Sequence, residues 1–275
     1  MSSDSDSDSE GESALVGSLP EQIGYLAANG DFGPPKAWLA GLAPDGSTVA
    51  PRSVNSLDTT GWTLLMCTAT SDFTTQAHVE FARYLIARGA KLDIQSAGTR
   101  CTALHFACGR RNEAGAALVS VLVDKGANVN LQSTWGETPL FMIEQASEST
   151  LDIVTTLLRA GASLDYEDRG SIWSFEEHLD GLEDDDPDQH FLAVRTLVAS
   201  VRAAGSWKAH CRLAHKEVLR LRSLVARGRV KLPSRTRRRS PRGRQARQAH
   251  ALEFVVRQGD NGIVWHILSF WRAPA

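Results

Sequence analysis

Three Gly-Ala pairs, at residues 89–90, 126–127 and 161–162, recur along the middle of this 275-residue chain. Each pair ends a helix-like apolar run and is followed by a short segment such as Asn128-Val129-Asn130. Glycine most readily takes the left-handed conformation that closes a helix. The pairs are 37 and 35 residues apart. A period of this length indicates a stack of two-helix units, in which each unit packs only on its neighbours.

The segment Gly98–Gln132 has the clearest unit pattern. Its T-A-L-H sequence starts at Thr102, whose hydroxyl can cap the first helix, and ends at His105, whose imidazole can hydrogen-bond backbone and hold the turn. A second helix-like run covers Ala117–Asp124 and ends before Gly126. Similar openings stand upstream at Gly61–Met66 (GWTLLM) and downstream at Gly136–Phe141 (GETPLF).

On these motifs, residues 55–166 resemble the ankyrin-repeat family. The resemblance implies an all-α fold, a solenoid of helix-turn-helix units with a C-terminal helical extension. The units are slightly longer than the usual ~33 residues. The surplus lies between the two helices of a unit, as in residues 70–78 and 109–115.

Composition and patterning set the expected domain boundaries. We expect an acidic, Ser-rich disordered tail at 1–13, an ankyrin-repeat domain at 14–205, an amphipathic helix at 206–227, a basic disordered linker at 228–250 and a short C-terminal helical segment at 251–275. Within the repeat domain the expected units are 14–54 (a capping unit), 55–95, 96–132, 133–166 and 167–205 (a degenerate unit). The acidic stretch 176–188 is expected to be a loop between helices.

The resemblance also implies how the chain acts, since ankyrin repeats bind partner proteins through their turn tips and the groove face of their first helices. The expected tip residues are Trp62, Thr99, Arg100, Cys101, Trp135 and Glu137, and the expected groove residues are Thr70, Arg110 and Gln145. Trp62 and Trp135 occupy nearly equivalent places in their units and are expected to project from one edge as binding anchors. The alternative is that each tryptophan only covers its own tip.

Residues that could carry chemistry have structural explanations. Cys108 occupies a small-residue core position, and His210, Cys211 and His215 fall short of the four ligands that zinc requires. No phosphate-binding glycine loop or nucleophile motif is present. We therefore expect no enzyme, no cofactor and no metal.

The basic linker leaves three interpretations open. Arg235, Arg237, Arg238 and Arg239 have the clustered charge of a nuclear import signal. The same charge could contact nucleic acid, although no aromatic residues are interleaved to stack bases. The third interpretation is a soluble tether.

Arg220–Arg229 followed by Gly262–Arg272 (GIVWHILSFWR) resembles the F-box-like or SOCS-box-like ends of some ankyrin proteins, and this suggests a second function for the tail, residues 251–272. The main hypothesis is an adaptor or scaffold, a monomer that binds protein partners, with the tail as a solenoid cap. The alternative is a substrate receptor that docks on a ubiquitin ligase through the tail.

The N-terminus lacks a secretory signal pattern, no apolar run spans a bilayer, and four cysteines suggest reduced thiols, so we expect a cytoplasmic or nuclear location.

Overall fold

The computed structural model describes residues 18–42, 52–71, 73–145, 147–182 and 189–226. The chain divides into two compact units, Met1–Phe191 and Leu192–Ala275, which are described separately. The predicted segments 1–13, 228–250 and 251–275 lie outside the described residues.

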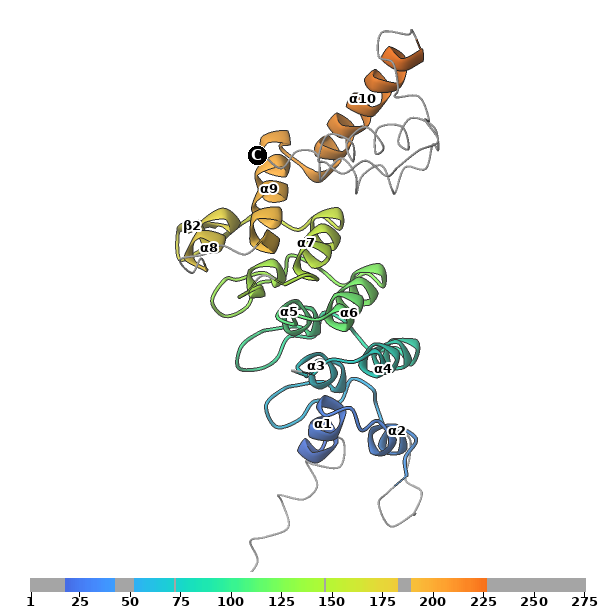
Figure 1. Ribbon diagram of the computed structural model, residues 1–275. Helices are drawn as coiled ribbons and strands as arrows, with labels where there is room; N and C mark the ends of the chain where they lie inside the picture. The colour runs from blue at the N-terminus through green and yellow to red at the C-terminus, as the bar shows by residue number, and fades with distance from the viewer. Residues whose placement is uncertain (1–17, 43–51, 72, 146, 183–188, 227–275) are drawn as a thin grey trace, which may run out of the picture. The chain divides into compact units, whose positions relative to one another are not determined.

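The helices of the first compact unit, Met1–Phe191, stand in two rows (Figure 1). One row contains α1 (Glu21–Ala28), α3 (Leu64–Ala69), α5 (Ala103–Cys108), the 3-10 helix η1 (Pro139–Met142) and α8 (Phe175–Gly181). The other contains α2 (Gly33–Leu39), α4 (Gln76–Ala87), α6 (Glu113–Asp124) and α7 (Thr150–Arg159). Within the first row α1 packs on α3, α3 on α5, α5 on η1 and η1 on α8; within the second, α4 packs on α6 and α6 on α7. The predicted all-α repeat solenoid is confirmed.

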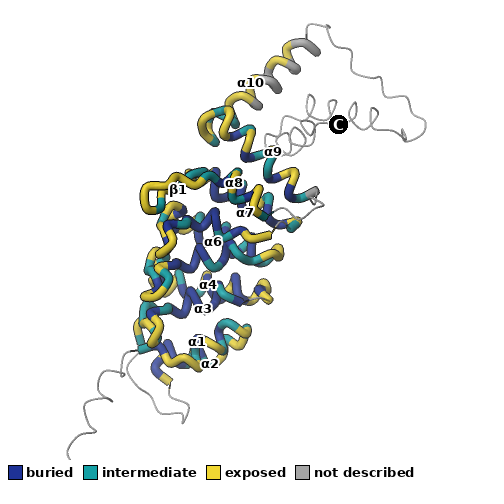
Figure 2. The backbone as a smooth tube through the Cα atoms, turned by 90° about the vertical axis from the view of Figure 1, so that its left-hand side faces the viewer, coloured by how far each residue is buried: buried dark blue, intermediate teal, exposed yellow. Residues whose placement is uncertain are grey.

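The core of this stack lies between the two rows, where the backbone is buried, while the loops at their ends are exposed (Figure 2). The central side chains are leucines with at most 1% exposure: Leu64, Leu65, Leu85, Leu104, Leu118, Leu122, Leu140. Burying each leucine contributes about 2 kcal/mol before entropy costs. The repeated leucine positions therefore hold consecutive units together.

The three glycine closures have the predicted conformation. Gly89, Gly126 and Gly161 have φ of 87°, 91° and 93°. After each of them, the alanine N–H donates to a carbonyl five residues earlier, as from Ala127 to Leu122 at 3.0 Å. This bond satisfies a carbonyl at the helix end, which explains why Gly-Ala recurs as a pair.

Two side-chain amides each bind the next glycine closure along the chain. The Asn55 amide donates to the Gly89 carbonyl at 3.1 Å and accepts from the Lys91 N–H at 2.7 Å. Asn130 makes the same two bonds to the next closure, at Gly161 (3.0 Å) and Ser163 (2.9 Å). Asn55 and Asn130 therefore each link their own segment to the next glycine closure along the chain.

Two segments differ from the helix-turn-helix expectation. The first helix of the third unit is only the 3-10 turn η1. The fourth opening is a β-hairpin of β1 (Asp165–Asp168) and β2 (Ser171–Ser174), antiparallel with Tyr166 opposite Trp173. Arg169 and Gly170 form its turn with φ of 51° and 82°, the paired positive values of a tight hairpin.

The acidic stretch 176–188 was predicted to be a loop, and its first part is helix instead. Residues 176–181 belong to α8, which Ser174 and Glu177 open with a reciprocal capping box. The Glu177 N–H donates to Ser174 Oγ at 3.2 Å, and the Ser174 N–H donates to Glu177 Oε2 at 3.1 Å. This S-x-x-E signal starts a helix despite the acidic composition.

The second compact unit begins at Leu192, inside α9 (Gln189–Ala204). It also contains α10 (Trp207–Ala226). Gly205, with φ of 80°, separates the two helices. The predicted amphipathic helix at 206–227 corresponds to α10. The predicted repeat domain ends at 205, whereas the boundary between the compact units follows Phe191.

Candidate partner-binding surface

Each unit opens with a turn tip that precedes its first helix. The backbone of the tip closes on itself, with bonds from Asp58 N to Trp62 O, from Ser96 N to Cys101 O and from Ser133 N to Glu137 O at 2.8–3.0 Å. We call these the first, second and third tips, and the β1–β2 hairpin the fourth tip. The tips form a row of exposed loops along one side of the stack (Figure 2).

The two tip tryptophans are not equivalent, contrary to the sequence-based expectation. Trp62 follows the positive-φ residue Gly61, whereas Trp135 precedes the corresponding Gly136. Trp62 is half-buried, and its ring lies 4.7 Å from the ring of Phe106 on the next unit's first helix. Trp135 is 56% exposed. Trp62 therefore covers the stack, whereas the Trp135 side chain is open to solvent.

In the second tip, Cys101 lies inside the structure, so the expectation of an exposed tip residue is wrong for this side chain. It is 4% exposed and follows Arg100, which takes the positive-φ position with φ of 54°. Burial raises the pKa of the Cys101 thiol. Thr99 is half-buried, and its carbonyl accepts from the Thr134 N–H at 2.9 Å. Only Arg100 is open to solvent among these three residues.

The groove candidates also separate into internal and external side chains. Arg110 donates from its guanidinium to the carbonyls of Phe106 at 3.2 Å and Thr70 at 3.1 Å, which joins the first and second units. Its position is therefore that of a brace between units. Gln145 is exposed, and Thr70 is half-buried.

Glu137 lies at the junction of the third and fourth tips. Burial, followed by the charge of Glu144, raises the pKa of the Glu137 carboxyl. The pKa of Tyr166 is likewise raised by burial and then by Glu137 and Asp168. Two acids, Glu137 and Asp168, therefore act on the tyrosine, and the Cβ of Asp168 packs against the third tip at Gly136, so the junction has a concentration of negative charge.

Two exposed apolar residues on the fourth tip were not among the sequence candidates. Ile172 is 74% exposed and Trp173 is 50% exposed. The signal for them was present in the sequence, because Tyr-Glu-Asp-Arg-Gly-Ser-Ile-Trp alternates around an Arg-Gly turn and so favours a hairpin.

His105 holds the second tip to the third. The Thr102 N–H donates to His105 Nδ1 at 3.0 Å. Because a backbone N–H can only donate, Nδ1 accepts and the ring proton is on Nε2. Nε2 then donates to the Glu137 carbonyl at 3.3 Å. Burial lowers the pKa of His105, so the neutral ring that this geometry requires is also the favoured form.

The buried cysteines lack the environment of a nucleophile. Burial and the charge of Asp58 raise the pKa of Cys67 to about 12, and burial raises that of Cys108 still further. Thiols with such values stay protonated near neutral pH and react slowly. Within the described ranges, no group of His, Cys, Asp or Glu side chains is arranged to hold a metal ion. No described helix has the length and apolar character that crossing a membrane requires.

The comparisons with known proteins agree with the architecture. Residues 75–168 match the family model described as "Ankyrin repeats (3 copies)". A search of curated proteins finds no match. The matched range runs from the N-cap of α4 to the end of β1, so it includes the second and third tips and the first strand of the fourth.

Proposed function

Because residues 75–168 are ankyrin repeats, which generally mediate protein–protein interaction, we propose that this chain is a monomeric, non-catalytic adaptor or scaffold. It binds its partner protein through the turn tips. The alternative function, a ubiquitin-ligase receptor, depends on residues 251–272, which lie outside the described residues.

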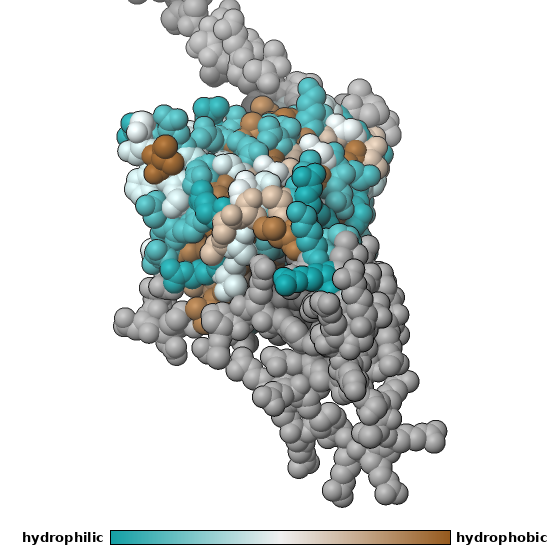
Figure 3. Space-filling model, turned by 90° about the horizontal axis from the view of Figure 1, so that it is seen from above, coloured by the Kyte–Doolittle hydropathy of each residue, from teal (hydrophilic) through white to brown (hydrophobic). Residues whose placement is uncertain are grey.

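The observation that supports this proposal is the exposure of large apolar side chains on the third and fourth tips. The indoles of Trp135 and Trp173 and the side chain of Ile172 are at least half exposed, while the leucine core is closed. Tryptophan is among the side chains that contribute most when an interface buries it. In Figure 3 the visible described surface is mainly hydrophilic, with separate small hydrophobic groups. Such isolated anchors suit a reversible interface better than a permanent one.

Site-specific photo-crosslinking tests the proposal. A benzoylphenylalanine placed at Trp135 in the full chain should capture a discrete partner from cell extract. The same group placed at the exposed Arg83 of α4, in the second helix row, is the control. Mass spectrometry identifies the captured chain, and purified partner should bind wild type with a measurable Kd. Capture from both positions alike, or no saturable binding of the purified protein, would refute a tip-directed adaptor.

We further propose that the adaptor works in the cytoplasm, the nucleus or both, with import directed by Arg235, Arg237, Arg238 and Arg239. Replacing these four arginines with alanine should shift a fluorescent fusion of the full chain out of the nucleus. An even distribution of the wild-type fusion would count against the import signal.

A further inference from the structure

We propose that the junction of the third and fourth tips binds an arginine-rich segment of the partner protein. The surface consists of Trp135, Glu137, Asp168 and Trp173, and we call it the tip-junction surface. This inference rests on the proposed adaptor function and adds the chemistry of the partner.

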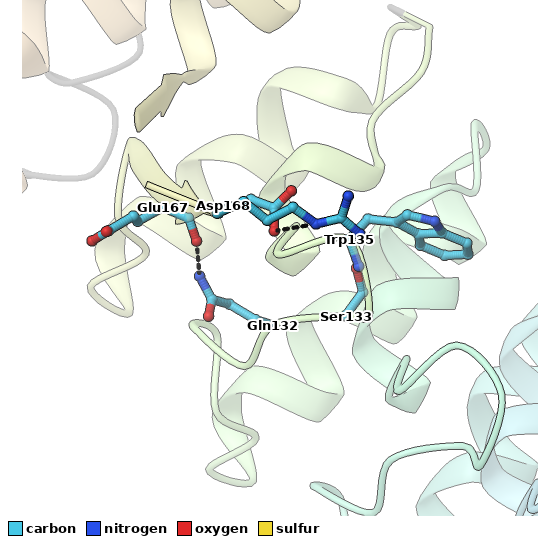
Figure 4. A network of polar contacts seen from close by, with 6 residues as sticks. Gln132, Ser133, Trp135, Glu167 and Asp168 are labelled. Carbon is cyan, nitrogen blue, oxygen red and sulfur yellow. Dashed lines mark hydrogen bonds and ion pairs between the residues drawn. The ribbon is translucent and has the colours of Figure 1, made fainter. Parts of the chain in front are cut away.

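Close backbone contact brings the two tips together. A Cβ atom on Gly136 would lie 2.8 Å from Asp168 Cβ and 3.2 Å from the Tyr166 ring, so the third tip packs directly against β1. Tyr166 pairs with Trp173 across the hairpin, and Asp168 is two residues from Tyr166. Side chains at such positions share one face of the hairpin. Figure 4 shows the Trp135 indole and the Glu167 side chain on opposite sides of Asp168.

The tryptophans supply flat faces for stacking. Trp173 precedes the helix cap Ser174, as Trp62 precedes the helix cap Thr63 in the first tip. The Trp62 ring is already covered by Phe106, whereas Trp173 is 50% exposed and Trp135 is 56% exposed. A planar cation is a favourable partner for an indole face. The indole of the fourth tip, Trp173, is therefore open for stacking, whereas the corresponding indole of the first tip, Trp62, is already covered.

The charges select a cation. Glu137 and Asp168 both raise the pKa of Tyr166, so both carboxylates act on the same ring. Arg169 forms an ion pair with Asp168: its Nε lies 4.0 Å from Asp168 Oδ1, and the side chains are 90% and 34% exposed, respectively. A pair this exposed contributes little and can exchange with a partner's cation. Asp58, the acid of the first tip, instead accepts from the N–H groups of Thr60 and Trp62.

The same features disfavour other occupants. An acidic peptide or a nucleic acid would be repelled by the carboxylates, and a purely apolar segment would leave Glu137 desolvated without a partner. Arginine suits the surface better than lysine, because its guanidinium stacks on indole while its N–H groups donate to a carboxylate. A preference for arginine over lysine is thus the distinguishing property of this surface.

The test uses fluorescein-labelled octa-arginine and octa-lysine peptides and the full-length chain, with binding measured by fluorescence anisotropy. Wild type should bind octa-arginine about tenfold more tightly than octa-lysine. Trp135→Ala and Trp173→Ala should each remove most of this preference, and Glu137→Gln with Asp168→Asn should weaken both peptides. Arg169→Ala should tighten binding, because it removes a competing cation. Unchanged melting temperatures of the two Trp variants show that the loss is local.

A triple variant, Asp184→Asn, Asp185→Asn and Asp186→Asn, is the control for unspecific attraction to acidic sequence. It should keep the arginine preference. The proposal is wrong if this control removes binding while the tip variants do not, or if the two peptides bind equally. It is also wrong if the Arg235, Arg237, Arg238 and Arg239 alanine variant binds octa-arginine tenfold better, since the chain's own basic segment then fills the surface. Each of these failures leaves capture of a partner at Trp135 possible, so it is distinguishable from failure of the adaptor function.

Discussion

Counted from residue 55, the second and third repeat units, 96–132 and 133–166, open with similar residues but fold differently. Thr102-Ala103-Leu104-His105 starts the α-helix α5, whereas Thr138-Pro139-Leu140-Phe141 gives only the 3-10 turn η1. The two openings differ at the second residue, where Pro139 replaces Ala103, and at the fourth, where Phe141 replaces His105. His105 accepts the N–H of Thr102, the helix cap, and Phe141 has no polar atom with which to do so. The Thr138 hydroxyl is accordingly buried with no hydrogen-bond partner among the described residues.

The third unit adds aromatic packing to a different polar link, in which His178 Nε2 donates to the Ile143 carbonyl at 3.0 Å. The ring of Phe141 lies 4.6 Å from Tyr166, 5.3 Å from Phe175 and 5.4 Å from His178, measured between ring centroids. Two of these contacts are edge-to-face, a favourable arrangement for aromatic rings. The second unit is thus held to the third by a neutral histidine, and the third to the fourth by a histidine bond together with an aromatic cluster. The cluster is the device that supports the fourth tip.

The largest expected effect is on that cluster. Phe141→Ala removes a side chain that is 3% exposed, and it should lower the free energy of unfolding by about 3–5 kcal/mol. Phe106→Ala is the matched control in the second unit, where the side chain is half-buried, and its cost should be smaller. Urea denaturation of the full chain measures both. A larger loss for Phe106→Ala would mean that the aromatic cluster does not hold the third unit.

The second prediction concerns the polar link. His105→Ala removes both the cap to Thr102 and the bond to the Glu137 carbonyl, and should cost about 1–3 kcal/mol. His105→Gln keeps a side chain that can reach the cap N–H but has no second ring nitrogen, so it should cost less. Equal losses for the two variants would show that only the bond to Glu137 matters.

Much of this architecture follows from sequence, because its causes are local. The glycine closures and the leucine positions each depend on a few neighbouring residues, and the predicted solenoid is confirmed. The positions of the tip and groove side chains are harder to predict from sequence, because they depend on the rest of the stack. Trp62 and Arg110 contact an adjacent unit, and Cys101 is buried. A single-unit template also assigns Trp62 and Trp135 to one place, although they lie on opposite sides of the positive-φ residue. The hairpin departs from this template as well, because its Arg169-Gly170 turn stands where a helical unit would open.

A smaller effect is expected from pH. Burial lowers the pKa of His105 from the ordinary 6.5, so the folded state binds this proton less readily than the unfolded chain. The contribution of His105 is therefore complete above 6.5 and is lost as the pH falls from there through the folded pKa. The difference in urea midpoint between wild type and His105→Gln should shrink over that interval. The variant corrects for the other histidines, and a difference independent of pH would contradict a neutral His105 link.

The smallest expected effect comes from the two cap hydroxyls. Thr102 Oγ1 lies 2.9 Å from His105 Nδ1, and since that nitrogen accepts, the hydroxyl can donate to it. Thr102→Val should therefore cost about 1 kcal/mol. Thr138→Val has nearly the same shape change but removes a buried hydroxyl that makes no bond, so unfolding should be unchanged or slightly harder, by about 0.5 kcal/mol at most. Paired urea titrations of the two variants give the comparison directly. Equal destabilisation would show that Thr138 has a partner in solution, and that the third unit is capped like the second after all.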